Sequence, residues 1–356
     1  MSLQPFVAQS PAAIEAELSA AGYRPFVARQ LLHNVYSLGL TSFDRMTDLP
    51  KRLREDLASR YALRTLQEVE CREAADGSFK LALRLQDGNL IECALLASGS
   101  RGTACVSSQV GCAMGCLFCA SGKRGLVRNL LPHEMIEQAL LVRDRLGDRE
   151  RLANVTFMGI GEPLANFEAL AVALERINDA AGMGIGARRI TVSTCGLTAG
   201  IRRLADLGRQ FHLAVSLHAP TDELRRRLVG RAAQTPIAEI MQAARYYFEK
   251  TTRKVTFEYV LIGGLNDAAD YARGLVSLLG DFPSMVNLIP LNPVAACPEL
   301  RAPDPAAVRQ FLSVLEQGGL EACIRRRKGA ELDAACGQLR IRVMDAPGDP
   351  DACTSH

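Results

Sequence analysis

Apolar and polar residues follow two successive patterns in the first hundred residues. Up to about residue 60 the apolar positions recur at helical spacing, as in residues 29–39 and 49–59. Ser10-Pro11 has the capping serine and first-turn proline of a helix start, and Gly22 is a helix-ending residue. Residues 64–97 have strand character, with Asp87-Gly88-Asn89 as a hairpin turn. We therefore expect a helical accessory domain over residues 1–62 and a β-hairpin extension over residues 63–100.

From about residue 103 strand-like and helical patterns alternate. The strand-like apolar runs are residues 103–108, 154–159, 189–194, 212–218, 255–261 and 285–291. Residues 133–146, 167–181, 237–250 and 306–317 have helical spacing between them. This alternation predicts an α/β fold, either an open parallel sheet or a partial (β/α)6 barrel over residues 101–345, followed by a tail over 346–356. No Gly-x-Gly-x-x-Gly opens a helix after the first strand, which disfavours dinucleotide binding.

Polar residues gather just after the carboxyl ends of the expected strands. They are Gly161-Glu162-Pro163, Ser193-Thr194, Ser216-Leu217-His218, Asn266-Asp267 and Asn292-Pro293. In β/α barrels this edge carries the active site. Loops generally begin with polar residues, so each group alone is weak, but together they favour a barrel with a ligand site.

Three cysteines, Cys112, Cys116 and Cys119, have the spacing CxxxCxxC. Three thiolates can hold three irons of a cubane iron–sulfur cluster and leave the fourth iron open for reaction. The spacing resembles that of radical S-adenosylmethionine (SAM) enzymes, whose open iron binds the amino and carboxylate groups of SAM. A structural zinc site would need a fourth ligand nearby, and the next candidate is His133, fourteen residues on. The cluster is the favoured reading.

Composition indicates where in the cell this chemistry takes place. No apolar run approaches the ~20 residues of a membrane span, and the N-terminus lacks the pattern of a signal peptide. We therefore expect a cytoplasmic protein, with most of its eleven cysteines reduced. The net charge of +3 does not by itself indicate nucleic-acid binding, although basic residues cluster at Arg124/Arg128, Arg225 to Arg227 and Arg325 to Lys328.

Several longer motifs give a more specific resemblance. They are CVSSQVGCAMGCLFCASGKRGLVRNL, FMGIGEPLANFEAL, ITVSTCGL, AVSLHAPTDELRRRL, NLIPLNP and DAACGQL. Together they resemble the RlmN/Cfr family of radical SAM methyltransferases, which act on adenosines in RNA, and RlmN more than Cfr. The resemblance covers nearly the whole chain. It implies a radical SAM partial barrel with an N-terminal accessory domain that helps hold RNA.

The resemblance also implies a set of cofactor residues. Cys112, Cys116 and Cys119 would bind a [4Fe–4S] cluster. The residues that would bind SAM are Gly161, Glu162, Ser193, Ser216, Leu217, His218 and Asn292. Two of these have structural alternatives: Glu162 as an acid at a helix N-terminus, and His218 as a packed core histidine.

The catalytic residues implied by the resemblance are two cysteines and one glutamate. Cys336 would carry the methyl group as a thioether and deliver it to the ring as a methylene radical, so that two SAM molecules are used per turnover. Glu92 would remove the ring proton, and Cys105 would release the RNA by forming a disulfide with Cys336. Without the resemblance, Glu92 is an exposed residue of a half-buried strand and Cys105 a buried strand cysteine.

Three functions remain open at this point. The favoured one is methylation of adenosine carbon-2 in 23S ribosomal RNA and also in transfer RNA. The second is carbon-8 methylation as in Cfr, or another RNA target, because segment 229–237, Leu291 and the acidic tail differ from the family pattern. The third is a non-catalytic, metal-stabilised RNA-binding protein. The enzyme would need an electron donor such as flavodoxin or ferredoxin, and we expect a monomer without a membrane partner.

Overall fold

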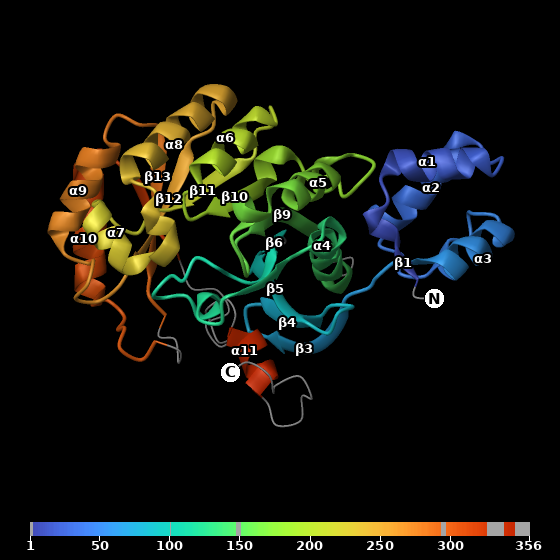
Figure 1. Ribbon diagram of the computed structural model, residues 1–356, viewed down its shortest axis with the longest axis horizontal. Helices are drawn as coiled ribbons and strands as arrows, with labels where there is room; N and C mark the ends of the chain where they lie inside the picture. Colours follow the sequence, from blue (N-terminus) through green and yellow to red (C-terminus); the bar gives the residue numbers. More distant parts are fainter. Residues whose placement is uncertain (1–2, 100, 147–150, 293–296, 326–337, 346–356) are drawn as a thin grey trace.

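The computed structural model describes residues 3–99, 101–146, 151–292, 297–325 and 338–345 (Figure 1). Its centre is a ten-stranded sheet in the order β14-β13-β12-β11-β10-β9-β6-β5-β4-β3. The strands are β3 Gln67–Glu73, β4 Phe79–Arg84, β5 Leu90–Ser98, β6 Arg101–Cys105, β9 Arg151–Phe157, β10 Ile190–Thr194, β11 His212–Ser216, β12 Val255–Leu261, β13 Ser284–Pro290 and β14 Glu321–Ile324. Strands β6 and β9 to β14 are parallel, whereas β3, β4, β5 and β6 pair antiparallel.

Helices cover the outside of the curved parallel part of the sheet (Figure 1). They are α4 Pro132–Leu146, α5 Phe167–Asn178, α6 Thr198–Asp206, α7 Asp222–Leu228, α8 Ile237–Thr251, α9 Ala269–Leu279 and α10 Pro305–Gln317. Parallel strands covered by helices are rich in apolar residues, and these apolar runs predicted the positions of the strands. The expected radical SAM type of partial (β/α)6 barrel is confirmed, with β14 as a further parallel strand. No helix in the described ranges is long and apolar enough to cross a membrane.

The N-terminal region is helical, as its pattern predicts. It contains α1 Pro11–Ala20, α2 Pro25–Tyr36 and α3 Lys51–Arg60, with short parallel strands β1 Gln4–Pro5 and β2 Tyr61–Ala62. Ser10 caps α1 by accepting a hydrogen bond from the amide of Ala13 at 3.0 Å. Beyond the end of the helix, Gly22 has a φ of +84°, which favours glycine. The domain boundaries at residues 62 and 100 stay predictions.

The expected hairpin forms between β4 and β5, but it is more buried than its sequence indicates. A C-terminal helix, α11 Gln338–Asp345, packs against both strands (Figure 1). Leu339 and Val343 of this helix form a small core with Ala82 and Leu90 of the hairpin. Burial of each large apolar side chain stabilises the contact by about 1.5–3 kcal/mol. The hairpin therefore joins the C-terminal segment to the main sheet.

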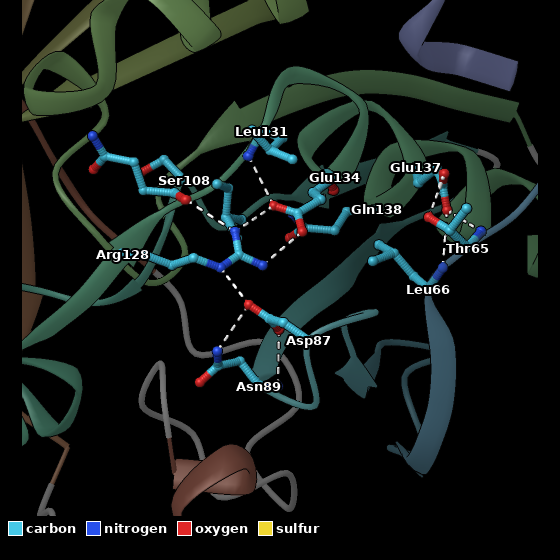
Figure 2. Close-up of polar contacts among 12 residues, drawn as sticks. Thr65, Leu66, Asp87, Asn89, Ser108, Arg128, Leu131, Glu134, Glu137 and Gln138 are labelled. Atoms are coloured by element: carbon cyan, nitrogen blue, oxygen red, sulfur yellow. Dashed lines mark hydrogen bonds and ion pairs between the residues drawn. The ribbon is translucent and has the colours of Figure 1, made fainter. Parts of the chain in front are cut away.

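Helix α4 holds the hairpin and the segment before it against the barrel. Figure 2 shows Arg128 between Asp87 of the hairpin turn, at 2.6 Å, and Glu134 of α4, at 2.8 Å. One turn further along α4, the buried carboxylate of Glu137 accepts hydrogen bonds from the amides of Thr65, at 2.6 Å, and Leu66, at 3.0 Å (Figure 2). These contacts fix the hairpin relative to the barrel edge that carries the site.

Candidate active site

A cavity of about 580 Å³ lies at the carboxyl ends of the parallel strands and extends to β4 and β5. Predicted site residues that line it are Glu92, Cys105, Cys112, Cys116, Cys119, Gly161, Glu162, Ser193, Ser216, His218 and Asn292. Leu217 is fully buried beside the cavity without lining it. Cys336 lies outside the described residues, two positions before α11 begins. The fold thus brings residues more than 190 positions apart into one site.

The cysteine motif is a loop between β7, Gln109–Gly111, and β8, Leu126–Asn129, which pair antiparallel. Gly111 has a φ of +79°, and a Cβ there would lie 2.0 Å from the carbonyl oxygen of Gly125, so only glycine fits. The amide of Cys112 donates to that same oxygen at 2.9 Å, and the amide of Leu117 donates to the carbonyl of Leu228. The loop is therefore held by backbone contacts at both ends.

The three thiols suit a cluster better than a single ion. In the described part of the chain, no three His, Cys, Asp or Glu side chains are grouped closely enough to hold one metal ion. A [4Fe–4S] cluster places iron and sulfide between its thiolates, so its ligands stand around a cavity. Burial raises the pKa of Cys112 to about 12, so the thiol keeps its proton until a cation replaces it. The donor set and the cavity therefore fit the expected cluster.

Glu162 is buried next to the cysteine loop and is held by backbone groups. Its carboxylate accepts hydrogen bonds from the amides of Cys195 at 2.7 Å and Leu164 at 3.1 Å. The second contact caps a short 3-10 helix, Pro163–Asn166. Glu162 therefore does lie at a helix N-terminus, as the structural alternative states. Burial raises the pKa of Glu162. Glu162 also lines the cavity, so these hydrogen bonds are compatible with the expected contact between its carboxylate and the SAM amino group.

Gly161→Ala is expected to weaken SAM binding by at least about 10-fold, because displacing the segment that holds Glu162 would cost at least one binding contact of about 1.4 kcal/mol. Gly161 has a φ of +110°, and a Cβ there would lie 2.6 Å from the Cβ of Gln109 in β7. The substitution would push Glu162 and the cysteine loop apart. Gly184→Ala is the matched control, because Gly184 has a φ of +66° with nothing within 4 Å. Equilibrium dialysis with SAM should separate the two variants, and equal affinities would contradict the prediction.

Polar groups at the next strand ends continue around the cavity. Ser193 lies near the end of β10 and Ser216 is the last residue of β11, and both are half-buried and line the cavity. After β13, the side-chain oxygen Oδ1 of Asn292 is buried and accepts no hydrogen bond from the described residues. An acceptor of this kind suits a ligand with amino or hydroxyl donors, as SAM has.

His218 is packed and its ring is neutral. Burial lowers its pKa to about 3, with Arg225 as a smaller cause. Its Nδ1 atom accepts from the amide of Val260 at 3.1 Å, which places the ring proton on Nε2. The ring also meets Phe118 edge-on at a centroid distance of 4.8 Å. The ring of His218 is therefore packed in the core, as the structural alternative states. The residue also lines the cavity, and its backbone has a φ of +60°.

Glu92 and Cys105 approach the cavity from neighbouring antiparallel strands. Cys105, the last residue of β6, lies opposite Ala94 of β5, two residues after Glu92. Glu92 is 4% exposed, so the expectation of an exposed glutamate is wrong; α11 and Lys80 cover it. Cys105 is buried, as the strand alternative states, and it also faces the cavity.

Several residues that line the cavity were not expected from the sequence, among them Lys80, Cys195 and Glu258. Lys80 and Glu258 are charged residues inside otherwise apolar strands, and this interruption could have identified them. Glu258 is 5% exposed and accepts a hydrogen bond from Asn287 at 2.8 Å. A hydrogen bond donated by the thiol of Cys195 lowers the pKa of the Cys116 thiol. A lone cysteine in a strand-end loop gives no comparable signal.

Two of the basic clusters in the sequence are partly engaged in contacts within the fold. Arg225 is fully buried, and its guanidinium donates to the carbonyls of Cys195 and, at 3.2 Å, Thr235. Only Arg226 and Arg227 of that run are exposed. After the cysteines, Arg128 of β8 forms ion pairs with Asp87 and Glu134, whereas Lys123 is exposed. The basic surface is therefore smaller than the sequence indicates.

Comparison with known proteins identifies the family. Residues 106–272 match the model of the radical SAM superfamily, and residues 9–63 match the ribosomal RNA large subunit methyltransferase N-terminal domain. Two relatives named "Probable dual-specificity RNA methyltransferase RlmN" are each 47% identical. The one from Symbiobacterium thermophilum aligns over 90% of this chain and 86% of its own, and the one from Rhodopirellula baltica over 91% and 87%.

A solved structure agrees along almost the whole chain. The crystal structure of a radical SAM methyltransferase from Sphaerobacter thermophilus has a TM-score of 0.89 and 43% identity, covering 94% of this chain and 98% of that one. Radical SAM proteins use a [4Fe–4S] cluster and SAM, which agrees with the cofactors expected from the cysteine motif. The chain therefore belongs to the RlmN/Cfr family of radical SAM RNA methyltransferases.

Proposed function

We propose that this protein methylates carbon-2 of an adenosine in 23S ribosomal RNA, with transfer RNA as a second substrate. The observation that carries the proposal is the single cavity shared by the cysteine motif, Glu92 and Cys105. It brings a cofactor site next to a carboxylate and a thiol that SAM binding alone does not require. The relatives named as dual-specificity RNA methyltransferases support an RNA substrate.

The chemistry explains why these groups are needed. Carbon-2 of adenine is electrophilic, so it does not attack the methyl group of the SAM sulfonium directly. When bound, the cluster and SAM supply a carbon-centred radical. The thiolate of Cys336 takes a methyl group from one SAM molecule, and S-adenosylhomocysteine is the leaving group. That methyl group then loses a hydrogen atom to the radical, and the resulting methylene radical adds to the ring carbon. The product of this step is a covalent link between the protein and RNA.

Release of the RNA requires two further residues. Glu92 accepts the proton from the ring carbon, and the ring radical gives up one electron, which would return to the bound cluster. The thiolate of Cys105 then attacks the sulfur of Cys336. The new disulfide replaces the sulfur–carbon bond, whose electron pair stays with the carbon and takes up a proton to give a methyl group. We propose that an external one-electron donor such as flavodoxin or ferredoxin supplies the electrons for the reaction. We also propose that the chain works as a monomer.

The test is nucleoside mass spectrometry of unmodified ribosomal and transfer RNA after incubation with cluster-loaded, reduced protein and SAM. We expect 2-methyladenosine. An 8-methyl product would assign the Cfr type of activity. SAM cleavage without methyladenosine would point to a different target. A colourless protein with one zinc and no activity would overturn the proposal in favour of a metal-stabilised RNA-binding protein.

A further inference from the structure

Lys80 shares one face of the antiparallel strands with Glu92 and Cys105. In the register of the strands, Lys80 lies opposite Ala94, and Ala94 lies opposite Cys105. Glu92 precedes Ala94 by two residues, so its side chain is on the same face and diagonal to Lys80. The small side chain of Ala94 leaves space between the three reactive groups. All four residues line the cavity.

The Glu92 carboxylate is held on both of its oxygen atoms. The ammonium group of Lys80 lies 3.3 Å from Oε1. The backbone amide of Arg340, in the first turn of α11, donates to Oε2 at 3.2 Å. The positive end of the helix dipole also faces the carboxylate from this side. The lysine and the helix therefore fix the direction in which the carboxylate points.

Fold stability gives little reason for a charge at position 80. Lys80 is 9% exposed and Glu92 is 4% exposed, and β4 is otherwise apolar along most of its length. Removing two charges from water generally costs about as much as their attraction returns, so an apolar pair would serve the fold as well. A buried ion pair at the edge of a reaction cavity is better explained by the chemistry that the carboxylate performs.

We propose that Lys80 is a positioning residue that holds the Glu92 carboxylate in place, aimed at the ring carbon of the RNA adenine. The proposal rests on the proposed function, in which Glu92 removes a proton. In that step the C–H bond of the ring carbon breaks, its electron pair stays with the ring and the proton passes to a carboxylate oxygen. Lys80 touches neither RNA nor SAM in this role, and it acts only through Glu92.

The test compares Lys80→Met, Lys80→Gln and Lys80→Arg in the cluster-loaded full chain, with an unmodified 23S ribosomal RNA transcript as the probe. We expect the two neutral variants to cleave SAM and methylate Cys336 as the unchanged protein does. Release of RNA from the covalent adduct should slow by at least about 10-fold, because a general base contributes ~10²–10⁴-fold. Lys80→Arg keeps the positive charge and should release RNA within a few-fold of the unchanged rate. Gel electrophoresis of the adduct and mass spectrometry of Cys336 measure the two steps separately.

Each alternative result has a distinct meaning. Normal release by both neutral variants would overturn the role of Lys80. An equal loss of SAM cleavage, Cys336 methylation and release would also overturn it, since a purely structural residue acts on every step. Glu92→Gln, run in parallel, should trap the adduct. If it does while the neutral Lys80 variants do not, only the inference about Lys80 fails; if Glu92→Gln turns over normally, the proposed base fails with it.

Discussion

Replacement of Cys105 by alanine is expected to leave the protein covalently bound to its RNA. In the proposed reaction this thiol breaks the bond between Cys336 and the methylated base, and no other step uses it. Cys105 ends β6 at the cavity, opposite Ala94, on the same face as Glu92. The variant should therefore bind SAM and start one turnover. The adduct should accumulate toward one RNA per protein, and released methyladenosine should fall by at least about 10³-fold.

Cys93→Ala is a matched control for this prediction. Cys93 is a buried thiol on β5 that belongs to the main hydrophobic core, and burial raises its pKa far above the usual value. Cys93 borders the same cavity, but the alternation of the strand turns its side chain to the face of β5 opposite Glu92. Its removal therefore costs packing, and RNA should leave at a normal rate. Electrophoresis under denaturing conditions, followed by nuclease treatment, detects the adduct. If Cys105→Ala turns over like the Cys93 variant, another group must resolve the adduct.

Most of the barrel could be predicted from the sequence because its central strands are buried on both faces. The runs around Ala214 and Phe257, for example, are mostly apolar, and alternating helices leave few other arrangements. The strand-end residues followed from that topology, since parallel strands direct their carboxyl ends to one edge. The cysteine spacing then identified the chemistry that this edge carries.

The environment of Glu92 could not be predicted, because it depends on distant parts of the chain. Its burial comes from α11, which begins almost 250 residues later and has only eight residues, too few for a clear periodic signal. Arg225 is a similar case: three consecutive arginines suggest a solvated face, yet the first points inward to the backbone of Cys195. Local pattern sets strands and helices, whereas tertiary packing decides which charged side chains are exposed.

Replacement of Cys336 by alanine is expected to abolish RNA methylation while leaving the cluster in place. Cys336 lies outside the described residues, but α11 starts two positions later and is anchored by the bond from Arg340 to Glu92. The cluster ligands lie in a separate loop between β7 and β8. Iron content and the visible spectrum should therefore be unchanged.

The decisive measurement for Cys336→Ala follows the methyl group itself. With SAM labelled in its methyl group, the unchanged protein should carry label on Cys336 and pass it to RNA, while the variant should do neither. Cys71→Ala is the control, because Cys71 lies on β3 at the outer edge of the sheet and does not line the cavity. Label transfer to RNA by Cys336→Ala would mean that the methyl group reaches adenine by another route. Loss of iron together with activity would instead place Cys336 among the residues that hold the cluster, and the methyl-carrier role would then fall.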